Sequence, residues 1–227
     1  WKHTRRFLRK ALLTYLIAVV LYLPLNWYNG GYSPLEWVKK LLADGTLYHL
    51  WYFPAVLLGV VVARNLARLP RGASLAIAAA LYLVGLGGDS YYGLISQVPA
   101  LEGLYGGIFQ VFDYTRNGLF FAPLFLLLGA EGMQWSRQAS AWALAGSFAA
   151  MTAEAFFLRG QGWPRHDSMY LTLPLVSVFL FSLLLGRNRG RDQRAARLSL
   201  LVYLLHPWSI VLVRGGAEVV GLEEIFI

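Results

Sequence analysis

Apolar residues along this chain gather into seven long runs separated by short polar segments. Most runs have roughly 17–22 residues, about the length of helix that crosses a ~30 Å hydrocarbon layer. Helix is the expected state, because backbone groups in lipid must pair within their own segment. The pattern therefore predicts an all-α integral membrane protein, a polytopic bundle of about seven transmembrane helices. The predicted spans are 11–28, 47–63, 74–88, 117–133, 140–158, 168–186 and 198–213.

The stretch 89–116 differs from these runs because Gly, Pro and aromatic residues interrupt it. It is predicted to be a re-entrant or interfacial segment. The chain begins at Trp1 with no initiator Met, and 221–227 becomes hydrophobic again. These ends predict a sequence truncated on both sides of a single transmembrane domain, 1–227.

Composition supports the membrane assignment, since 57% hydrophobic and 14% charged residues lie beyond the range of soluble domains. Most of the 20 Lys and Arg precede the first span or fall in 64–71, at Arg137 and in 187–197. The positive-inside rule then places these segments in the cytoplasm, as parts of a multi-pass cell-membrane protein. The net charge of +8 is thereby explained by topology and anionic lipid, without nucleic acid.

Several chemistries are excluded by residue content. With no Cys, the chain has no disulfide, thiolate metal site or cysteine nucleophile. The four His are far apart along the chain, so no metal site is predicted. The sequence also lacks a Gly-rich phosphate loop, a zinc-binding His-Glu-x-x-His helix and a nucleophile elbow.

Two ionisable residues fall inside predicted spans, where an unpaired polar group is costly. Glu154 lies late in the fifth span and His206 in the middle of the seventh. As catalytic candidates, His206 would act as a general base and Glu154 would orient a hydroxyl or transfer a proton. Alternatively, His206 bonds a carbonyl left free by Pro207, and Glu154 reaches the membrane interface.

A second polar group lies where spans meet the predicted outer surface. Arg116 would clamp a carboxylate, and Asp89 or Asp113 would hold an ammonium, which suits a zwitterionic amino acid or another polar acceptor. Alternatively, Asp113 and Asn117 cap a helix while Arg116 snorkels and pairs with Asp113. The substrate-binding candidates are His49, Trp51, Asp89, Tyr91, Asp113, Arg116 and Asn117, with Tyr48 as a further wall residue.

A third group is basic and precedes the first span. Arg6 and Arg9 are three residues apart and therefore share one face of a helix. Two guanidinium groups there would bind the phosphates of a nucleotide. The alternative is that they only set topology.

The order of these motifs resembles the acyltransferase-3 family and, within it, the membrane domain of VanT-type serine/alanine racemases. The resemblance covers nearly the whole chain. It is carried by Arg6-x-x-Arg9, Tyr48-His49-Leu50-Trp51-Tyr52-Phe53-Pro54, Gly87-Gly88-Asp89-Ser90-Tyr91-Tyr92-Gly93-Leu94-Ile95, Asp113-Tyr114-Thr115-Arg116-Asn117-Gly118-Leu119-Phe120-Phe121-Ala122-Pro123 and Tyr203-Leu204-Leu205-His206-Pro207.

The resemblance implies transfer of an acyl group, usually acetyl, from cytoplasmic acyl-CoA to a hydroxyl of an envelope carbohydrate or similar acceptor. Arg6 and Arg9 match the family's basic pair and would bind acyl-CoA, while His206 and Glu154 would support the acceptor hydroxyl. The family's first helices, which carry its transfer His, are not in this sequence. The fragment alone is therefore expected to be inactive.

The racemase-like interpretation implies a module that binds or takes up L-serine for a cytoplasmic racemase domain fused after it. No C-terminal soluble domain with a pyridoxal-phosphate lysine is present in the sequence. A third interpretation is a purely structural anchor, in which the polar residues meet no ligand. At the level of the family, the acyltransferase interpretation is preferred, with the serine module and the anchor as alternatives.

Overall fold

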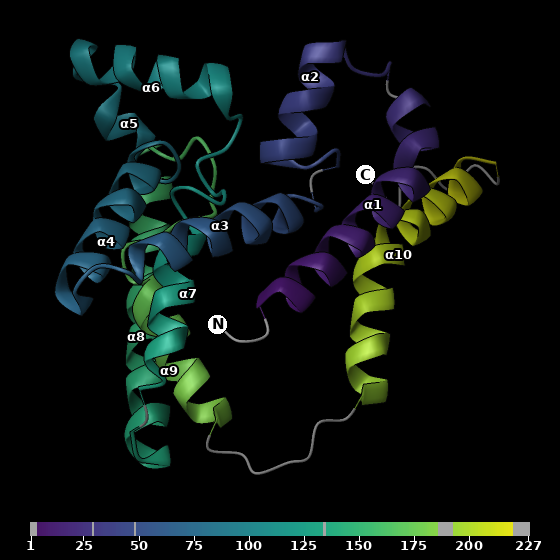
Figure 1. The fold of residues 1–227 in the computed structure, drawn as a ribbon. Helices are drawn as coiled ribbons and strands as arrows, with labels where there is room; N and C mark the ends of the chain where they lie inside the picture. The colour runs from purple at the N-terminus through teal and green to yellow at the C-terminus, as the bar shows by residue number, and fades with distance from the viewer. Residues whose placement is uncertain (1–3, 29, 48, 134, 186–192, 220–227) are drawn as a thin grey trace. The chain divides into compact units, whose positions relative to one another are not determined.

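The computed structural model describes residues 4–28, 30–47, 49–133, 135–185 and 193–219 (Figure 1). Helices and turns make up this described part, and it contains no strand, so the all-α prediction is confirmed. The chain divides into two units, Trp1–Arg187 and Asn188–Ile227. Each unit is described by itself.

The first unit holds nine α-helices and one π-helical turn within the described ranges, and the second holds a single long helix. In chain order they are α1 (Thr4–Tyr28), α2 (Pro34–Lys39), the π-helical turn η1 (Lys40–Asp44), α3 (Tyr52–Leu66), α4 (Arg71–Gly87), α5 (Tyr92–Ile95), α6 (Pro99–Val111), α7 (Ala122–Glu131), α8 (Arg137–Gly160), α9 (Leu173–Leu185) and, in the second unit, α10 (Gln193–Val219).

Each predicted span overlaps a helix, but the count of seven membrane-crossing helices is not confirmed. Among the described residues, the helices long and apolar enough to cross a membrane lie at Thr4–Tyr28, Arg137–Gly160 and Arg194–Ala217. The other four, α3, α4, α7 and α9, are apolar but have only 10–17 residues. Three predicted spans, 47–63, 117–133 and 168–186, begin before their helices, because the described residues 49–51, 117–121 and 168–172 form turns or irregular backbone instead of helix.

The first unit packs α3 against α4 and α7, and α8 against α9. Its buried core contains Tyr82 and Leu86 of α4 and Leu124 and Leu127 of α7, with Met169 from the segment before α9. The Tyr82 hydroxyl donates to the Tyr170 carbonyl at 2.6 Å and so ties α4 to that segment. This core fixes the turns at one end of the helices relative to one another.

Small residues bring α3 close to the turn before α7. A Cβ on Gly59 would lie 2.5 Å from the Ala122 Cβ, and one on Gly118 would lie 2.5 Å from the Leu58 Cβ. Close approach of this kind is a usual basis of helix packing in membranes, where lipid offers no hydrophobic drive to associate. The turn before α7 carries Arg116 and Asn117, so this contact also positions the polar site.

We expect Gly59→Leu to lower the free energy of unfolding by about 1–3 kcal/mol, because the added side chain overpacks this contact. Gly146→Leu on α8 is the matched control, since a Cβ there meets nothing within 4 Å. Thermal unfolding of both variants in the same detergent checks the difference. Equal unfolding midpoints would contradict the close packing of α3 on α7.

The stretch predicted to be re-entrant or interfacial contains α5 and α6. Figure 1 shows α6 lying across the direction of α4 and α8, the orientation that an interfacial helix would have. The Tyr105 side chain of α6 is buried, and its hydroxyl donates to the Val84 carbonyl at 2.7 Å. That bond anchors α6 over the end of α4.

Candidate functional site

Three turns meet at the end of the helices where α4 and α8 stop and α7 and α9 start. The Gly93 N–H donates to the Trp163 carbonyl at 2.7 Å, and the Arg165 N–H donates to the Asp89 carbonyl at 3.1 Å. The Thr115 hydroxyl donates to the Gly85 carbonyl at 2.7 Å. Segments far apart in the sequence are thereby held together around one polar cluster.

Asp89 is the buried acid of this cluster, with none of its side chain exposed. Its Oδ1 accepts hydrogen bonds from the Ser90 hydroxyl at 2.9 Å and from the N–H groups of Ser168 and Met169 at 2.8 and 2.9 Å. Its Oδ2 is buried and has no hydrogen-bond partner within the described part of the chain. Burial raises the pKa of Asp89, and the three hydrogen bonds and the nearby Arg116 only partly counteract this.

Arg116 is the base of the cluster. Its Nη1 donates to the Ser168 hydroxyl at 2.8 Å, and its guanidinium carbon lies 5.2 Å from the Trp51 ring centroid and 4.8 Å from that of Tyr114. Aromatic faces at these distances stabilise a guanidinium cation. Its Nε is buried, and no described residue accepts a hydrogen bond from it.

Asp89 and Arg116 therefore form a site with one unsatisfied acceptor and one unsatisfied donor of opposite charge. Ser168 connects them, since its N–H bonds Asp89 and its hydroxyl bonds Arg116. Buried polar atoms in folded proteins almost always have partners, so unpaired ones indicate a water or a ligand. Neither Ser168 nor Tyr114 was among the predicted site residues, because nothing in their local sequence indicates their contacts with Arg116.

Asp113 is not part of the Asp89–Arg116 site, although the sequence predicted either acid as the one that would hold an ammonium. Its carboxylate pairs with Lys39, at 2.6 Å, and with Lys40. Burial opposes its ionisation, but the two lysines outweigh that effect and lower the pKa of Asp113. The alternative in which Arg116 pairs with Asp113 is wrong, because Arg116 bonds Ser168 instead.

The neighbouring Asp44 holds the backbone of the same turn. It is 3% exposed, and its carboxylate accepts from the N–H groups of Asp113 at 2.9 Å and Tyr114 at 3.3 Å. Asp44 thus ties the η1 turn to the segment that carries Arg116. Asp44 was not among the predicted site residues, because its partner Asp113 lies 69 residues further along the chain.

Asn117 caps the turn that precedes α7, whereas the alternative interpretation expected it to cap a helix; the residue before α7 is Phe121, which makes no side-chain cap. Its Oδ1 accepts from the N–H groups of Leu119 and Phe120 at 2.9 and 3.0 Å, and its Nδ2 donates to the Tyr114 carbonyl at 2.8 Å. The amide is therefore occupied by backbone groups. Its role in the described structure is to shape the turn beside Arg116.

Glu154 and Tyr91 are brought together, although the sequence assigned them to different groups. The Glu154 carboxylate accepts from the Tyr91 hydroxyl at 2.8 Å and from the Leu171 N–H at 2.6 Å. It also accepts from the N–H and hydroxyl of Thr172, at 3.1 and 2.6 Å. Glu154 and Asp89 thus bind successive backbone N–H groups of the segment leading into α9.

His206 belongs to the second unit. Its Nδ1 lies 2.9 Å from the Tyr203 carbonyl, which has no helical donor because Pro207 has no N–H. This contact agrees with the alternative interpretation, in which His206 bonds a backbone carbonyl left free by Pro207. Because His206 and Glu154 are described in separate units, the structure does not test them as a catalytic pair.

Arg6, Arg9 and His49 are not among the residues that the contacts above bring to Asp89 and Arg116. Arg6 and Arg9 are exposed on the first turns of α1. His49 is buried, with its ring edge-on to Tyr22 at 5.1 Å between centroids. Tyr48 lies outside the described residues. Within the described ranges, no three His, Asp or Glu side chains gather as a metal ion would require.

Comparison with known proteins identifies relatives across almost the whole chain. A family model for an acyltransferase domain, that of the acyltransferase-3 family, matches residues 1–223. An amino-acid racemase of Enterococcus faecalis is 41% identical over 232 residues, covering 97% of this chain and 33% of the relative. A serine/alanine racemase of Enterococcus gallinarum is 42% identical over 216 residues, covering 90% of this chain and 30% of the relative.

The chain therefore spans about a third of the length of these curated relatives. No solved structure matches it. The family match extends over the helices of both units, including the motifs around Arg6, Arg116 and His206. This chain belongs to the acyltransferase-3 family of membrane proteins.

Proposed function

We propose that this chain is the membrane module of an amino-acid racemase. The proposed ligand is a small zwitterionic amino acid, and the first candidate is L-serine. The two relatives described above are named as racemases, and one as a serine/alanine racemase. Because the chain covers only about a third of either, a fused cytoplasmic racemase domain is the proposed partner. The module would take up or present L-serine to that domain.

The observation that carries this proposal is the pair of unsatisfied buried atoms, Asp89 Oδ2 and Arg116 Nε. An amino acid supplies the two complementary groups. Its ammonium would donate to Asp89 Oδ2, and its carboxylate would accept from the Nε edge of Arg116, since Nη1 already bonds Ser168. The rings of Trp51 and Tyr114 would limit the space beside the guanidinium.

The predicted topology places the Asp89–Arg116 site on the side of the membrane that an uptake module would use. With the basic segments predicted to be in the cytoplasm of a bacterial cell, the Asp89–Arg116 site would lie toward the outer surface, where an uptake module meets its substrate. Arg6 and Arg9 then lie on the cytoplasmic side. The two candidate ligands, serine and acyl-CoA, would therefore reach the protein from opposite sides.

The second candidate function is acyl transfer from cytoplasmic acyl-CoA to a hydroxyl of an envelope carbohydrate or similar acceptor. The family match over residues 1–223 favours it. Arg6 and Arg9, exposed and three residues apart on α1, would bind the phosphates of acyl-CoA. The catalytic role of Glu154 is the weaker part of this second candidate, because its carboxylate already accepts hydrogen bonds from four donors.

One experiment with the full-length parent protein in proteoliposomes separates the two functions. It compares uptake of labelled L-serine with transfer of label from acetyl-CoA, for wild type, Arg116→Lys and Arg6→Ala. Serine uptake is expected, and Arg116→Lys should weaken serine binding about tenfold because lysine lacks the planar fork that bonds both Ser168 and a carboxylate. Arg68→Lys, at an exposed position after α3, is the matched control.

The opposite result is equally clear. Label transferred from acetyl-CoA in wild type, lost in Arg6→Ala and accompanied by no serine uptake, would overturn the serine proposal and establish the acyltransferase. Serine uptake unaffected by Arg116→Lys would reject the Asp89–Arg116 site while leaving the module function in place.

A further inference from the structure

A large apolar cavity lies between α1, the continuous helix formed by α2 and η1, α3 and the end of α6. Its volume is about 850 Å³. Its walls include Leu12 of α1, Leu42 and Ala43 of η1, Leu57 and Leu58 of α3, and Phe112. The size is within the range of cavities that hold small-molecule ligands, which is roughly 300–1,000 Å³.

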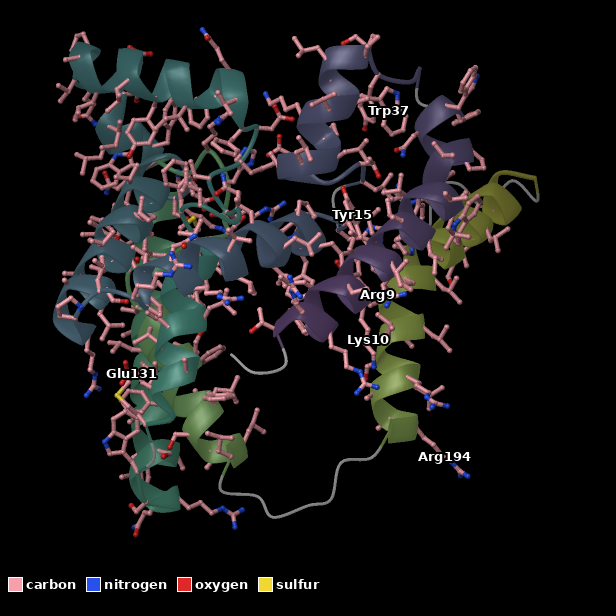
Figure 2. The ribbon with its side chains drawn as sticks, in the orientation of Figure 1. Arg9, Lys10, Tyr15, Trp37, Glu131 and Arg194 are labelled. Atoms are coloured by element: carbon pink, nitrogen blue, oxygen red, sulfur yellow. The ribbon has the colours of Figure 1, made fainter. Side chains whose placement is uncertain are left out.

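Of the four polar side chains that line this cavity, Gln110 is exposed and the other three are bonded to the protein. The Tyr15 hydroxyl, on the face of α1 toward the α2–η1 helix (Figure 2), donates to the Leu41 carbonyl at 3.0 Å. Lys39 donates to the Phe109 carbonyl at 3.0 Å and pairs with Asp113. The Glu36 carboxylate accepts from the Ser33 N–H at 2.8 Å. The cavity therefore offers an occupant mainly hydrocarbon surface.

The apolar walls are also open to the surroundings. Leu42 is 69% exposed, Leu35 79% and Val111 58% in the protein alone. In a membrane-embedded helical protein, such a surface faces lipid tails, and an apolar cavity left empty costs stability through the contacts its walls lose. A water-filled cavity would need polar partners, and three of the four polar side chains that line it are already bonded.

We propose that one acyl chain of a membrane phospholipid occupies this cavity. A phospholipid fits better than a free fatty acid, because a fatty acid would bring a carboxylate to a rim whose lysines, Lys39 and Lys40, already share Asp113. A phospholipid keeps its charged headgroup in the interface, beside the aromatic residues Tyr32 and Trp37, and inserts only hydrocarbon. This inference does not depend on the identity of the polar ligand.

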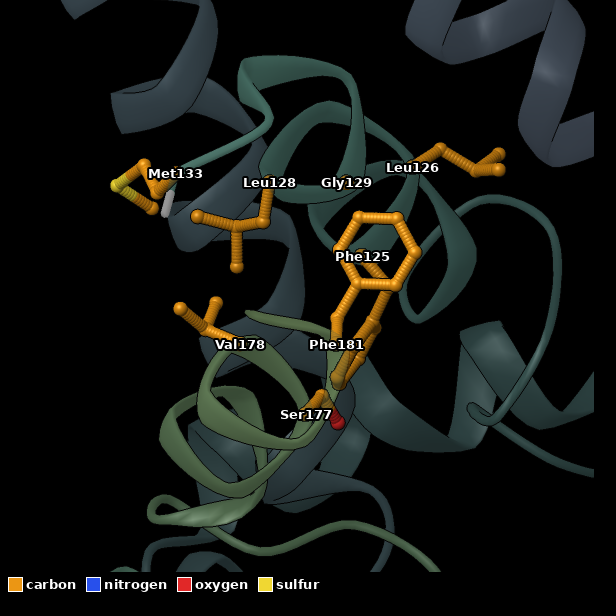
Figure 3. Close-up of a pocket in the computed structure, with 8 residues that line it drawn as sticks. All are labelled: Phe125, Leu126, Leu128, Gly129, Met133, Ser177, Val178 and Phe181. Atoms are coloured by element: carbon orange, nitrogen blue, oxygen red, sulfur yellow. The ribbon is translucent and has the colours of Figure 1, made fainter. Parts of the chain in front are cut away.

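The bound chain would also support the polar site. The α2–η1 helix forms one wall of the cavity and carries Asp44, Lys39 and Lys40, which hold the segment leading to Arg116. Filling the cavity would pack this helix against α1 and α3. A second apolar cavity, of about 390 Å³ between α7 and α9, provides an internal comparison (Figure 3).

The test uses the full-length protein in phosphatidylethanolamine and phosphatidylglycerol vesicles that contain a trace of phosphatidylcholine with a diazirine in one acyl chain. After irradiation, labelled peptides are mapped by mass spectrometry. Labelling in 12–15, 35–43 and 54–58 is expected to exceed severalfold that of the exposed α8 face around Phe156. Ala43→Phe and Leu57→Trp, which fill the cavity from two different walls, should each remove the excess.

Val178→Phe, which projects into the second cavity, is the matched control and should leave the excess unchanged (Figure 3). Labelling of the cavity walls no stronger than that of α8, or insensitive to both filling variants, would overturn the proposal. A parallel arm replaces the phospholipid by a diazirine fatty acid. Excess labelling by the fatty acid alone would overturn the phospholipid assignment.

Discussion

Replacing Asp89 by asparagine is expected to weaken binding of L-serine by about two orders of magnitude. The asparagine keeps the shape of the side chain but removes the charge that would meet the ammonium and leaves Arg116 without a nearby carboxylate. Removing one member of a buried charge pair typically costs about 2–5 kcal/mol, and about 1.4 kcal/mol corresponds to tenfold in affinity. Isothermal titration with the full-length protein in nanodiscs measures this change.

The same residue sets the expected pH dependence. Burial raises the pKa of Asp89, and the ammonium requires the ionised carboxylate. Affinity is therefore full above the raised pKa of Asp89 and is lost as the pH falls through it, earlier in an acid titration than for an ordinary aspartate. Asp89→Asn should show no such loss.

Asp113→Asn is the comparison that distinguishes the two acids, because Asp113 is paired with Lys39 and Lys40. It should change serine affinity much less than Asp89→Asn. If the two variants lost affinity equally, or if Asp113→Asn lost more, the ammonium would not be bound by Asp89.

Replacing Glu154 by alanine is expected to lower the free energy of unfolding by about 2–4 kcal/mol, because four hydrogen-bond donors, three of them in part-buried bonds, lose their acceptor together. These donors are the Tyr91 hydroxyl, the Leu171 N–H and two groups of Thr172. Glu154→Gln retains one acceptor oxygen and should lose less. Glu102→Ala, at an exposed position on α6, is the control.

Thermal unfolding in detergent, measured together with acyl transfer from acetyl-CoA, determines which role Glu154 has. A lower unfolding midpoint in Glu154→Ala with no effect in the control supports its role as an anchor for the start of α9. Unchanged stability together with lost acyl transfer would instead favour the catalytic role considered from the sequence.

The helix positions were predictable from sequence because apolar periodicity and length depend on neighbouring residues alone. The lengths of α3, α7 and α9 were not, since apolar residues in the turns before them look the same as apolar residues in helix. At the site, Trp51 and Arg116 were predicted and do meet. Ser168 and Tyr114 were missed, because both are brought to Arg116 by the packing of separate turns.

The sequence by itself determined that this is a helical membrane protein of the acyltransferase-3 family with acids and a base at one end of its helices. Only the tertiary structure decided which acid serves Arg116. Asp89 and Asp113 are equivalent by local sequence, but Lys40, 73 residues before Asp113, binds that carboxylate, as does Lys39. Asp89 lies buried with one oxygen unpaired among the described residues. Such pairings depend on contacts between distant segments, and the order of residues along the chain does not specify them.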